Sequence, residues 1–210
     1  GKFQPIPWVY GDIVRHLAAV EDVHILVDHA AAEKKARHLL HRCGANFARV
    51  HFHHWPTDRV WLRDSGPIFL TSASGNRTIP ALAITDWQFN AWAKYENWHH
   101  DDQIPARVAE LLSLPAWTPQ IPMPDGQSHR VVLEGGSIDV NGAGALLTTE
   151  ECLLSEIQQR NPGISREQLE QCFRDYQGIE QVLWMNRGIA GDDTHGHGDD
   201  IARFIDPHPI

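Results

Sequence analysis

A single ten-residue stretch, GDDTHGHGDD at residues 191–200, holds most of the chemically active side chains in one place. It contains four aspartates and two histidines separated by glycines. If the stretch is extended, His195, His197 and Asp199 point to one face, because side chains alternate along a strand. Zinc accepts histidine and carboxylate ligands at such spacing, with Asp193 as a possible further ligand. A histidine held by a carboxylate could instead act as an acid/base, and a polar turn is the third reading.

Two further stretches place a carboxylate beside a strand. Asp64 lies in VWLRDSGPIFL, just before an apolar run, and Glu134 ends the apolar run of VVLEGGSIDV. A carboxylate at the end of a buried strand needs a partner. Taken singly, these residues are typical of an Asp-Ser-Gly turn and of a salt bridge at a sheet end.

A fourth stretch, DWQFNAWAKY, is rich in aromatic residues. Trp87, Phe89 and Trp92 could form part of the core, or they could wall a pocket for a flat cation. Another histidine cluster, HFHH at residues 51–54, is either a set of surface side chains at a strand end or a source of metal ligands.

Alternating strand-like and helix-like segments must position these side chains. Apolar runs and turn residues predict an α+β fold, in a single domain over residues 1–210 without a linker. The expected helices cover residues 13–20, 29–44, 101–114, 149–160 and 166–177. The expected strands cover residues 23–28, 46–52, 66–70, 79–85, 179–185 and 201–205, with short β runs over 129–149.

Composition narrows the class of partner. The 210 residues carry a formal net charge of −9 without a cluster of lysine or arginine, which argues against nucleic acid and anionic membranes. No apolar run approaches the roughly 18 residues of a membrane helix. Cys43, Cys152 and Cys172 form no CxxC pair, which favours reduced thiols in a cytoplasmic protein.

The four stretches together resemble the agmatine deiminase family, also called Porphyromonas-type peptidylarginine deiminases. The matching segments are WLRDSGP, WQFNAWAKY, LEGGSIDVNGAGALLTTEECLL and GDDTHGHGDDIARF, in the family's order and over nearly the whole chain. The resemblance implies a pentein fold, a propeller of five ββαβ modules, of which 210 residues supply about three. It also implies hydrolysis of a guanidine to a ureido product and ammonia, without metal or cofactor.

The resemblance assigns roles residue by residue. It implies that Asp64 and Asp199 bind the guanidinium nitrogens, that His197 is the acid/base and that Glu134 supports this histidine. Arg63 and Trp92 are expected beside the substrate. Carboxylate pairs match the planar N–H fork of a guanidinium through charge-assisted hydrogen bonds. The substrate is then a small cationic guanidine, agmatine or an arginine-type molecule, and a homo-oligomer is possible.

The family's nucleophile is a cysteine far downstream of the Gly-His-x-Asp motif, and the sequence stops at Ile210. We therefore expect no nucleophile in these 210 residues, and no turnover by them alone. Cys152 is not expected to replace it, although the first turn of a helix favours a thiolate. Gly198 stands where the family usually has valine or isoleucine, and Ala91 and Ala93 stand where it usually has glycine.

Two other classes of protein stay open. A truncated pentein could be a non-catalytic protein that binds cationic ligands or a partner chain through open strand edges. A metal-binding protein could use His195, His197 and Asp199, with residues 51–54.

Overall fold

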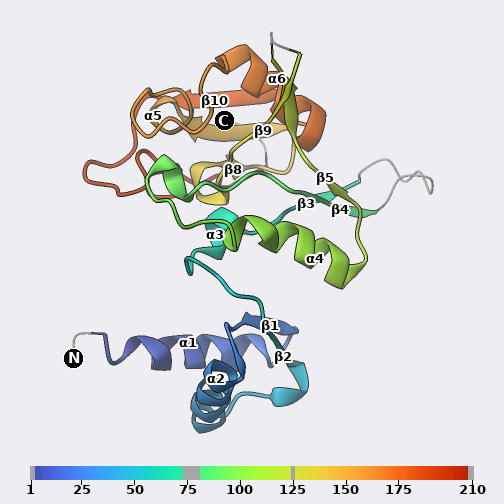
Figure 1. Ribbon diagram of the computed structural model, residues 1–210, viewed down its shortest axis with the longest axis vertical. Coiled ribbons are helices and arrows are strands. Elements are labelled where there is room, and N and C mark those ends of the chain that lie inside the picture. The colour runs from blue at the N-terminus through green and yellow to red at the C-terminus, as the bar shows by residue number, and fades with distance from the viewer. Residues whose placement is uncertain (1–2, 73–80, 124–125, 208–210) are drawn as a thin grey trace. The chain divides into compact units, whose positions relative to one another are not determined.

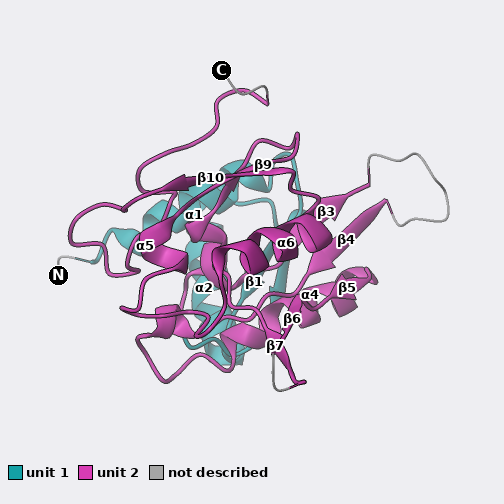
Figure 2. Cartoon of the chain, turned by 90° about the horizontal axis from the view of Figure 1, so that it is seen from above, with its two compact units in different colours: residues 1–58 teal, residues 59–210 magenta. Residues whose placement is uncertain are grey.

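The computed structural model describes residues 3–72, 81–123 and 126–207, and the chain divides into two compact units, residues 1–58 and 59–210 (Figure 2). We describe each unit by itself. The prediction of one domain stays a prediction, because two compact units can belong to one domain. Within the described residues, no helix is both long enough and apolar enough to cross a membrane.

The first unit consists of two helices and a two-stranded parallel sheet (Figure 1). Its core is formed by Ala18, Leu40 and Val50. The expected helix and strand boundaries around residues 23–44 are nearly right. The elements are α1 (Ile6–Leu17), β1 (Val23–Leu26), α2 (Ala30–Cys43), the 3₁₀ helix η1 (Phe47–Arg49) and β2 (Val50–His53).

Two glycines explain how the helices of this unit end and pack. Gly44 follows α2 with φ of 76°, a left-handed conformation that glycine adopts at low cost. The predicted start of α1 at residue 13 is wrong, because the helix runs through Gly11 and begins at Ile6. Gly11 faces α2 so closely that a Cβ there would lie 2.6 Å from Cys43 Sγ.

The second unit contains two three-stranded sheets of the same topology. In each, an antiparallel pair is followed by a helical connection and a strand parallel to the second strand, which is a ββαβ order. One sheet has the order β3-β4-β5 and the other β10-β9-β8. The strands are β3 (Ile68–Thr71), β4 (Leu82–Thr85), β5 (Ala116–Trp117), β8 (Asp139–Val140), β9 (Ala145–Thr149) and β10 (Gln181–Met185).

Shorter elements complete this unit, and a two-stranded antiparallel sheet of β6 and β7 stands apart from the other two. The turn predicted between β3 and β4 lies largely outside the described residues. The remaining elements are α3 (Leu62–Ser65), η2 (Ala91–Ala93), η3 (Asp101–Gln103), α4 (Ile104–Leu112), β6 (Gln120–Pro122), β7 (Ser128–Arg130), η4 (Gly135–Ser137), α5 (Glu150–Leu153) and α6 (Arg166–Gln177).

The main core lies where α6 packs against the β8–β10 sheet and the residues before it. Leu169, Cys172 and Phe173 of α6 are buried among Leu133 and Leu146. Cys172, 3% exposed, is thus part of the core. Ser165 begins α6 with a capping box, as the sequence pattern indicates.

Two predicted elements are wrong. The helix expected over residues 149–160 ends at Leu153, and Gln158 further along has φ of 47°, which a helix does not allow. Residues 201–205 do not form a strand. There the amide of Phe204 donates to Oδ2 of Asp139 at 2.7 Å, so a side chain takes the place of a neighbouring strand.

Candidate active site

A cavity of about 430 Å³ in the second unit brings most of the predicted site residues together. Its lining carries five aspartates and two arginines, so it favours a cation. Arg63, Trp92, Asp64, His197 and Asp199 all lie in its wall, as the sequence patterns predict. The full lining is Arg59, Trp61, Arg63, Asp64, Trp92, Tyr95, Asp192, Asp193, Thr194, His197, Asp199 and Asp200.

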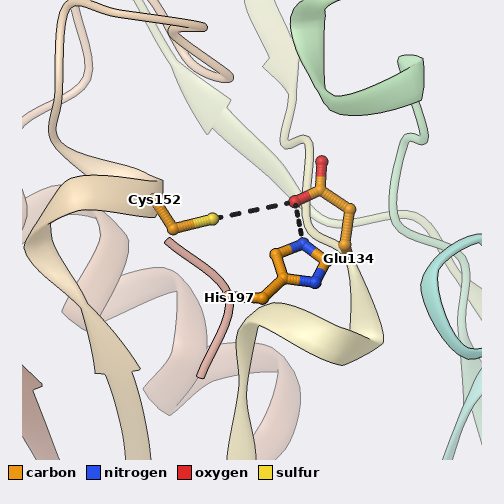
Figure 3. Close-up of side chains that lie close together, drawn as sticks. All are labelled: Glu134, Cys152 and His197. Atoms are coloured by element: carbon orange, nitrogen blue, oxygen red, sulfur yellow. Dashed lines mark hydrogen bonds and ion pairs between the residues drawn. The ribbon is translucent and has the colours of Figure 1, made fainter. Parts of the chain in front are cut away.

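His197 stands between three carboxylates. Its Nδ1 lies 3.8 Å from Oδ1 of Asp64 and 3.9 Å from Oδ1 of Asp199, on the cavity side. Its Nε2 lies 3.4 Å from Oε2 of Glu134, on the side of the protein interior (Figure 3). Burial lowers the pKa of His197, but the Glu134 hydrogen bond and the other carboxylates outweigh it and raise that pKa above its usual value.

Glu134 lies behind the histidine and does not line the cavity. Its side chain is fully buried. The residue stands at the end of the segment that follows β7, directly before η4. Arg160, also without solvent exposure, donates from Nε to Oε1 at 3.1 Å and to Oε2 at 3.3 Å. Burial alone raises the pKa of Glu134, but the charge of Arg160 and the contact with His197 bring it below its usual range. Glu134 therefore stays ionised against the imidazole.

Arg160 is the residue that the sequence patterns missed. Its Nη1 donates to the carbonyl of Gln158 at 2.9 Å, and its Nη2 donates to the carbonyl of Thr194. It thereby connects Glu134 to the loop that carries His197. The sequence holds one signal for it, because a buried carboxylate requires a cationic partner. This signal does not identify the arginine that provides the charge.

Asp64 is held by two donors at the end of α3. Trp92 Nε1 donates to Oδ2 at 3.1 Å, and the amide of Gly136 donates to Oδ1 at 3.2 Å. Burial nevertheless raises the pKa of Asp64 to about 6. The two donors therefore do not offset the cost of burying the ionised carboxylate of Asp64. A guanidinium in the cavity would stabilise it by charge-assisted hydrogen bonds.

Gly136 lets the backbone approach both functional side chains. A Cβ at this position would lie 2.5 Å from Oδ1 of Asp64 and 2.7 Å from Nδ1 of His197. Its carbonyl also accepts from the amide of Asp199 at 3.1 Å. The second glycine of the Glu-Gly-Gly sequence therefore has a steric reason to lack a side chain.

Trp92 reaches Asp64 from an unusual backbone. Ala91, Trp92 and Ala93 have φ of 50°, 60° and 50°, all in the left-handed region that side chains disfavour. Asn90 accepts from the amide of Ala93 at 2.9 Å and helps to hold this turn. Strain of this kind is concentrated at functional sites.

The stretch GDDTHGHGDD is a turn and not a strand, so His195, His197 and Asp199 do not share the face that an extended stretch would give them. Asp192 accepts from the amides of Thr194, Gly196 and His197 at 2.9, 2.9 and 3.1 Å, and His195 has φ of 64°. These hydrogen bonds outweigh burial and lower the pKa of Asp192. The carboxylate thus fixes the loop that presents His197.

This turn also separates the residues of the alternative metal site. His195 lies 3.3 Å from the hydroxyl of Ser155 and lines a different cavity from that of His197 and Asp199. Asp193 forms an ion pair with Lys94 and accepts from the hydroxyl of Tyr95 at 3.0 Å.

The second histidine cluster is partnered within the first unit. His51 pairs with Asp22 at 3.2 Å and His54 with Glu33 at 2.6 Å.

None of the three cysteines lines the cavity. Cys152 is fully buried in α5, Cys172 is buried in α6 and Cys43 belongs to the first unit. Burial, reinforced by the charge of Glu134, raises the pKa of Cys152 well above its usual value, so the first turn of α5 does not produce a thiolate.

Cys152 nevertheless lies close to the histidine. Its Sγ is 3.8 Å from Oε2 of Glu134 (Figure 3). Within the described residues, Glu134, Cys152 and His197 form the one group of three potential metal ligands whose atoms lie within 4.8 Å of one another.

Comparison with known proteins agrees with this geometry. The model of the Porphyromonas-type peptidyl-arginine deiminase family matches residues 1–210, and the chain belongs to that family. Agmatine deiminase of Stutzerimonas stutzeri is 32% identical over 211 residues, which cover 98% of this chain and 51% of the relative. The chain spans about half the length of the curated relatives it matches.

Solved structures show the same fold. An agmatine deiminase of Enterococcus faecalis, described as catalyzing its reaction, has a TM-score of 0.79 and 31% identity, over 98% of this chain and 51% of that one. An agmatine deiminase of C. jejuni with substrate bound has a TM-score of 0.74 and 25% identity, over 97% of this chain and 54% of that one. The α+β architecture is therefore that of agmatine deiminases.

Proposed function

We propose that this chain supplies the guanidine-binding and acid/base half of a deiminase site, whose whole protein hydrolyses a small guanidine to a ureido product and ammonia. One observation carries the proposal. Asp64 and Asp199 lie within 3.8 and 3.9 Å of the same imidazole nitrogen, in the wall of a cavity rich in carboxylates. A planar cation between two carboxylates offers paired N–H donors to both.

The reaction follows from these positions and from the family's covalent chemistry. A cysteine thiolate attacks the central guanidine carbon, a C–N bond breaks, and His197 gives its proton to the departing ammonia. Water then attacks the same carbon and loses a proton to His197, and the C–S bond breaks. Glu134 holds the imidazole and stabilises its charged form throughout.

The thiolate of this scheme comes from outside the 210 residues, as the resemblance implies. Cys152 and Cys172 are buried, and neither lines the cavity. The 210 residues alone are therefore predicted to bind a guanidine without turnover. The pentein propeller of about three modules and the homo-oligomer stay predictions from the resemblance. The cytoplasmic location stays a prediction from the cysteine pattern.

Agmatine is the first substrate to test, because the excess of carboxylates in the cavity suits a ligand without a carboxylate. Calorimetric titration should show agmatine binding to the chain. Asp64→Asn and Asp199→Asn should each weaken it by at least about tenfold, the loss of one charge-assisted contact. Asp175→Asn, an equal change of charge on the exposed face of α6, serves as the control. If the affinity for agmatine is unchanged in both Asp64→Asn and Asp199→Asn, the proposal is wrong.

A further inference from the structure

The buried thiol of Cys152 has no place in the proposed reaction, yet it lies beside two residues that do. Cys152 and Glu134 are fully buried and His197 is 3% exposed. The three side chains come from α5, from the segment after β7 and from the loop after β10, and they point toward one another (Figure 3). Such convergence of a thiol, a carboxylate and an imidazole is the ligand chemistry of zinc.

The distances fit a tetrahedral ion. With zinc–ligand bonds of about 2.0–2.3 Å, neighbouring oxygen and sulfur ligands lie about 3.5 Å apart, and oxygen and nitrogen ligands about 3.3 Å apart. Here Oε2 of Glu134 lies 3.8 Å from Sγ of Cys152 and 3.4 Å from Nε2 of His197. All three atoms fall within 4.8 Å of one another. Shifts of a few tenths of an ångström would bring Oε2 to the ligand separations of zinc from both Sγ and Nε2.

The surrounding residues suit bound ligands. Arg160 donates from Nε to Oε1 of Glu134 at 3.1 Å and to Oε2 at 3.3 Å, which holds the carboxylate in place. An ionised carboxylate oxygen has two lone pairs, so Oε2 can bind a cation beside this contact. The other imidazole nitrogen of His197, Nδ1, faces Asp64 at 3.8 Å. Metal-bound histidines usually direct their second nitrogen at a carboxylate, which fixes the tautomer.

We propose that Glu134, Cys152 and His197 form a binding site for a thiophilic divalent cation of the zinc class, and that the bound cation inhibits the acid/base histidine. Binding forms metal bonds to Sγ, Oε2 and Nε2. The thiol proton of Cys152 leaves to solvent, and the Nε2 proton that His197 shares with Glu134 leaves as well, so that the bound imidazole is neutral with its proton on Nδ1. No electron is transferred. The inhibitory part rests on the proposed function. A His197 whose Nε2 holds a metal cannot form the imidazolium, and the cavity-side Nδ1 of that imidazolium is the group that gives its proton to ammonia.

Cobalt(II) is the probe for the site, because cobalt bound to a thiolate absorbs in the near ultraviolet and cobalt bound only to exposed histidines does not. All proteins would carry Cys43→Ser, which removes the half-exposed thiol. Cys152→Ser tests the site and Cys172→Ser is the matched control, because both are buried cysteines of one core. Circular dichroism checks folding, and Cys152→Ala replaces a serine variant that does not fold.

The thiolate band should saturate in the Cys172→Ser protein, disappear on addition of zinc and be absent from the Cys152 variant. Replacing Cys152 should lower the affinity for zinc by more than roughly 100-fold, because the loss of even an outer-shell partner lowers metal affinity by about 10–100-fold. A band of equal strength in both variants, or none in the Cys172→Ser protein, overturns the proposal.

A second titration separates this inference from the proposed function. Zinc should weaken agmatine binding in the Cys172→Ser protein and leave it unchanged in the Cys152 variant. A cobalt–thiolate band without any agmatine binding would support the metal site and contradict the proposed function. Agmatine binding without a thiolate band would do the reverse.

Discussion

The guanidinium of Arg160 lies 3.1 Å from the carboxylate of Glu134, and neither side chain is exposed to solvent. Removal of one member of a buried ion pair leaves the other charge unpaired, which costs about 3–5 kcal/mol. We therefore expect Arg160→Met to lower the free energy of unfolding of the second unit by that amount in urea denaturation. The double variant with Glu134→Leu should recover much of the loss. A loss below about 1 kcal/mol in the single variant would contradict the pairing.

Gly136→Ala should damage binding more than folding. The added methyl group would meet Asp64 and His197 at 2.5 and 2.7 Å, so both side chains must move. Agmatine affinity is expected to fall by more than roughly tenfold, the effect of misplacing one charge-assisted contact. Gly142→Ala, where a Cβ meets open space but φ is +72°, controls for a loss of stability without a clash at the site. Equal affinities in the two variants would show that the close approach is unimportant.

Ala93→Gly should stabilise the chain. Ala93 is exposed and has φ of 50°, and an L-residue pays roughly 1–2 kcal/mol for this conformation. Glycine avoids most of that cost and loses about 0.5–1 kcal/mol of chain entropy. We expect the free energy of unfolding, measured by denaturant titration, to rise by up to about 1 kcal/mol. Ala36→Gly in α2 should lower it. If both substitutions lower it, the backbone at Ala93 is not strained.

Agmatine binding should tighten with pH on the acid side. The pKa of Asp64 lies at about 6, above its usual value, and only the ionised carboxylate attracts a guanidinium. Below pH 6 the affinity should therefore drop about tenfold for each pH unit, and above pH 6 this contribution should level off.

The imidazolium of His197 repels the same ligand, and the pKa of this histidine is raised. Its deprotonation should add a second gain in affinity at higher pH, which His197→Gln removes while the acid-side slope remains. The dissociation constant is measured by calorimetry between pH 5 and 8. A flat profile below pH 6 would show that Asp64 does not bind the head group.

Local signals predicted the regular elements best where capping residues were present. Ser165 precedes α6 and Gly44 follows α2, and the expected bounds 166–177 and 29–44 agree with the observed helices to within one residue. The start of α1 was missed because Gly11 reads as a break in the sequence, whereas helix packing requires it. Residues 201–205 were read as a strand from apolar character alone, and that pattern does not reveal whether a partner strand exists.

The grouping of Asp64, Glu134 and His197 was implied by the resemblance to the family, which rests on several motifs in order and not on any one of them. Each has an ordinary structural reading by itself. Arg160 could not be assigned, because its role depends on a chain reversal after α5 that brings a residue 26 positions away onto Glu134. The orientation of His195 away from the cavity likewise depends on the positive φ of the turn.

The central claim is that the cavity recognises the charged, planar head of a guanidine. Its most direct test compares agmatine with its ureido counterpart, in which an oxygen replaces one terminal nitrogen and the head group is neutral. Both ligands have the same tail, so calorimetry on the 210-residue chain isolates the head group. The account predicts agmatine binding at least about tenfold tighter, from charge-assisted hydrogen bonds to Asp64 and Asp199. Equal affinity for the two ligands would contradict it.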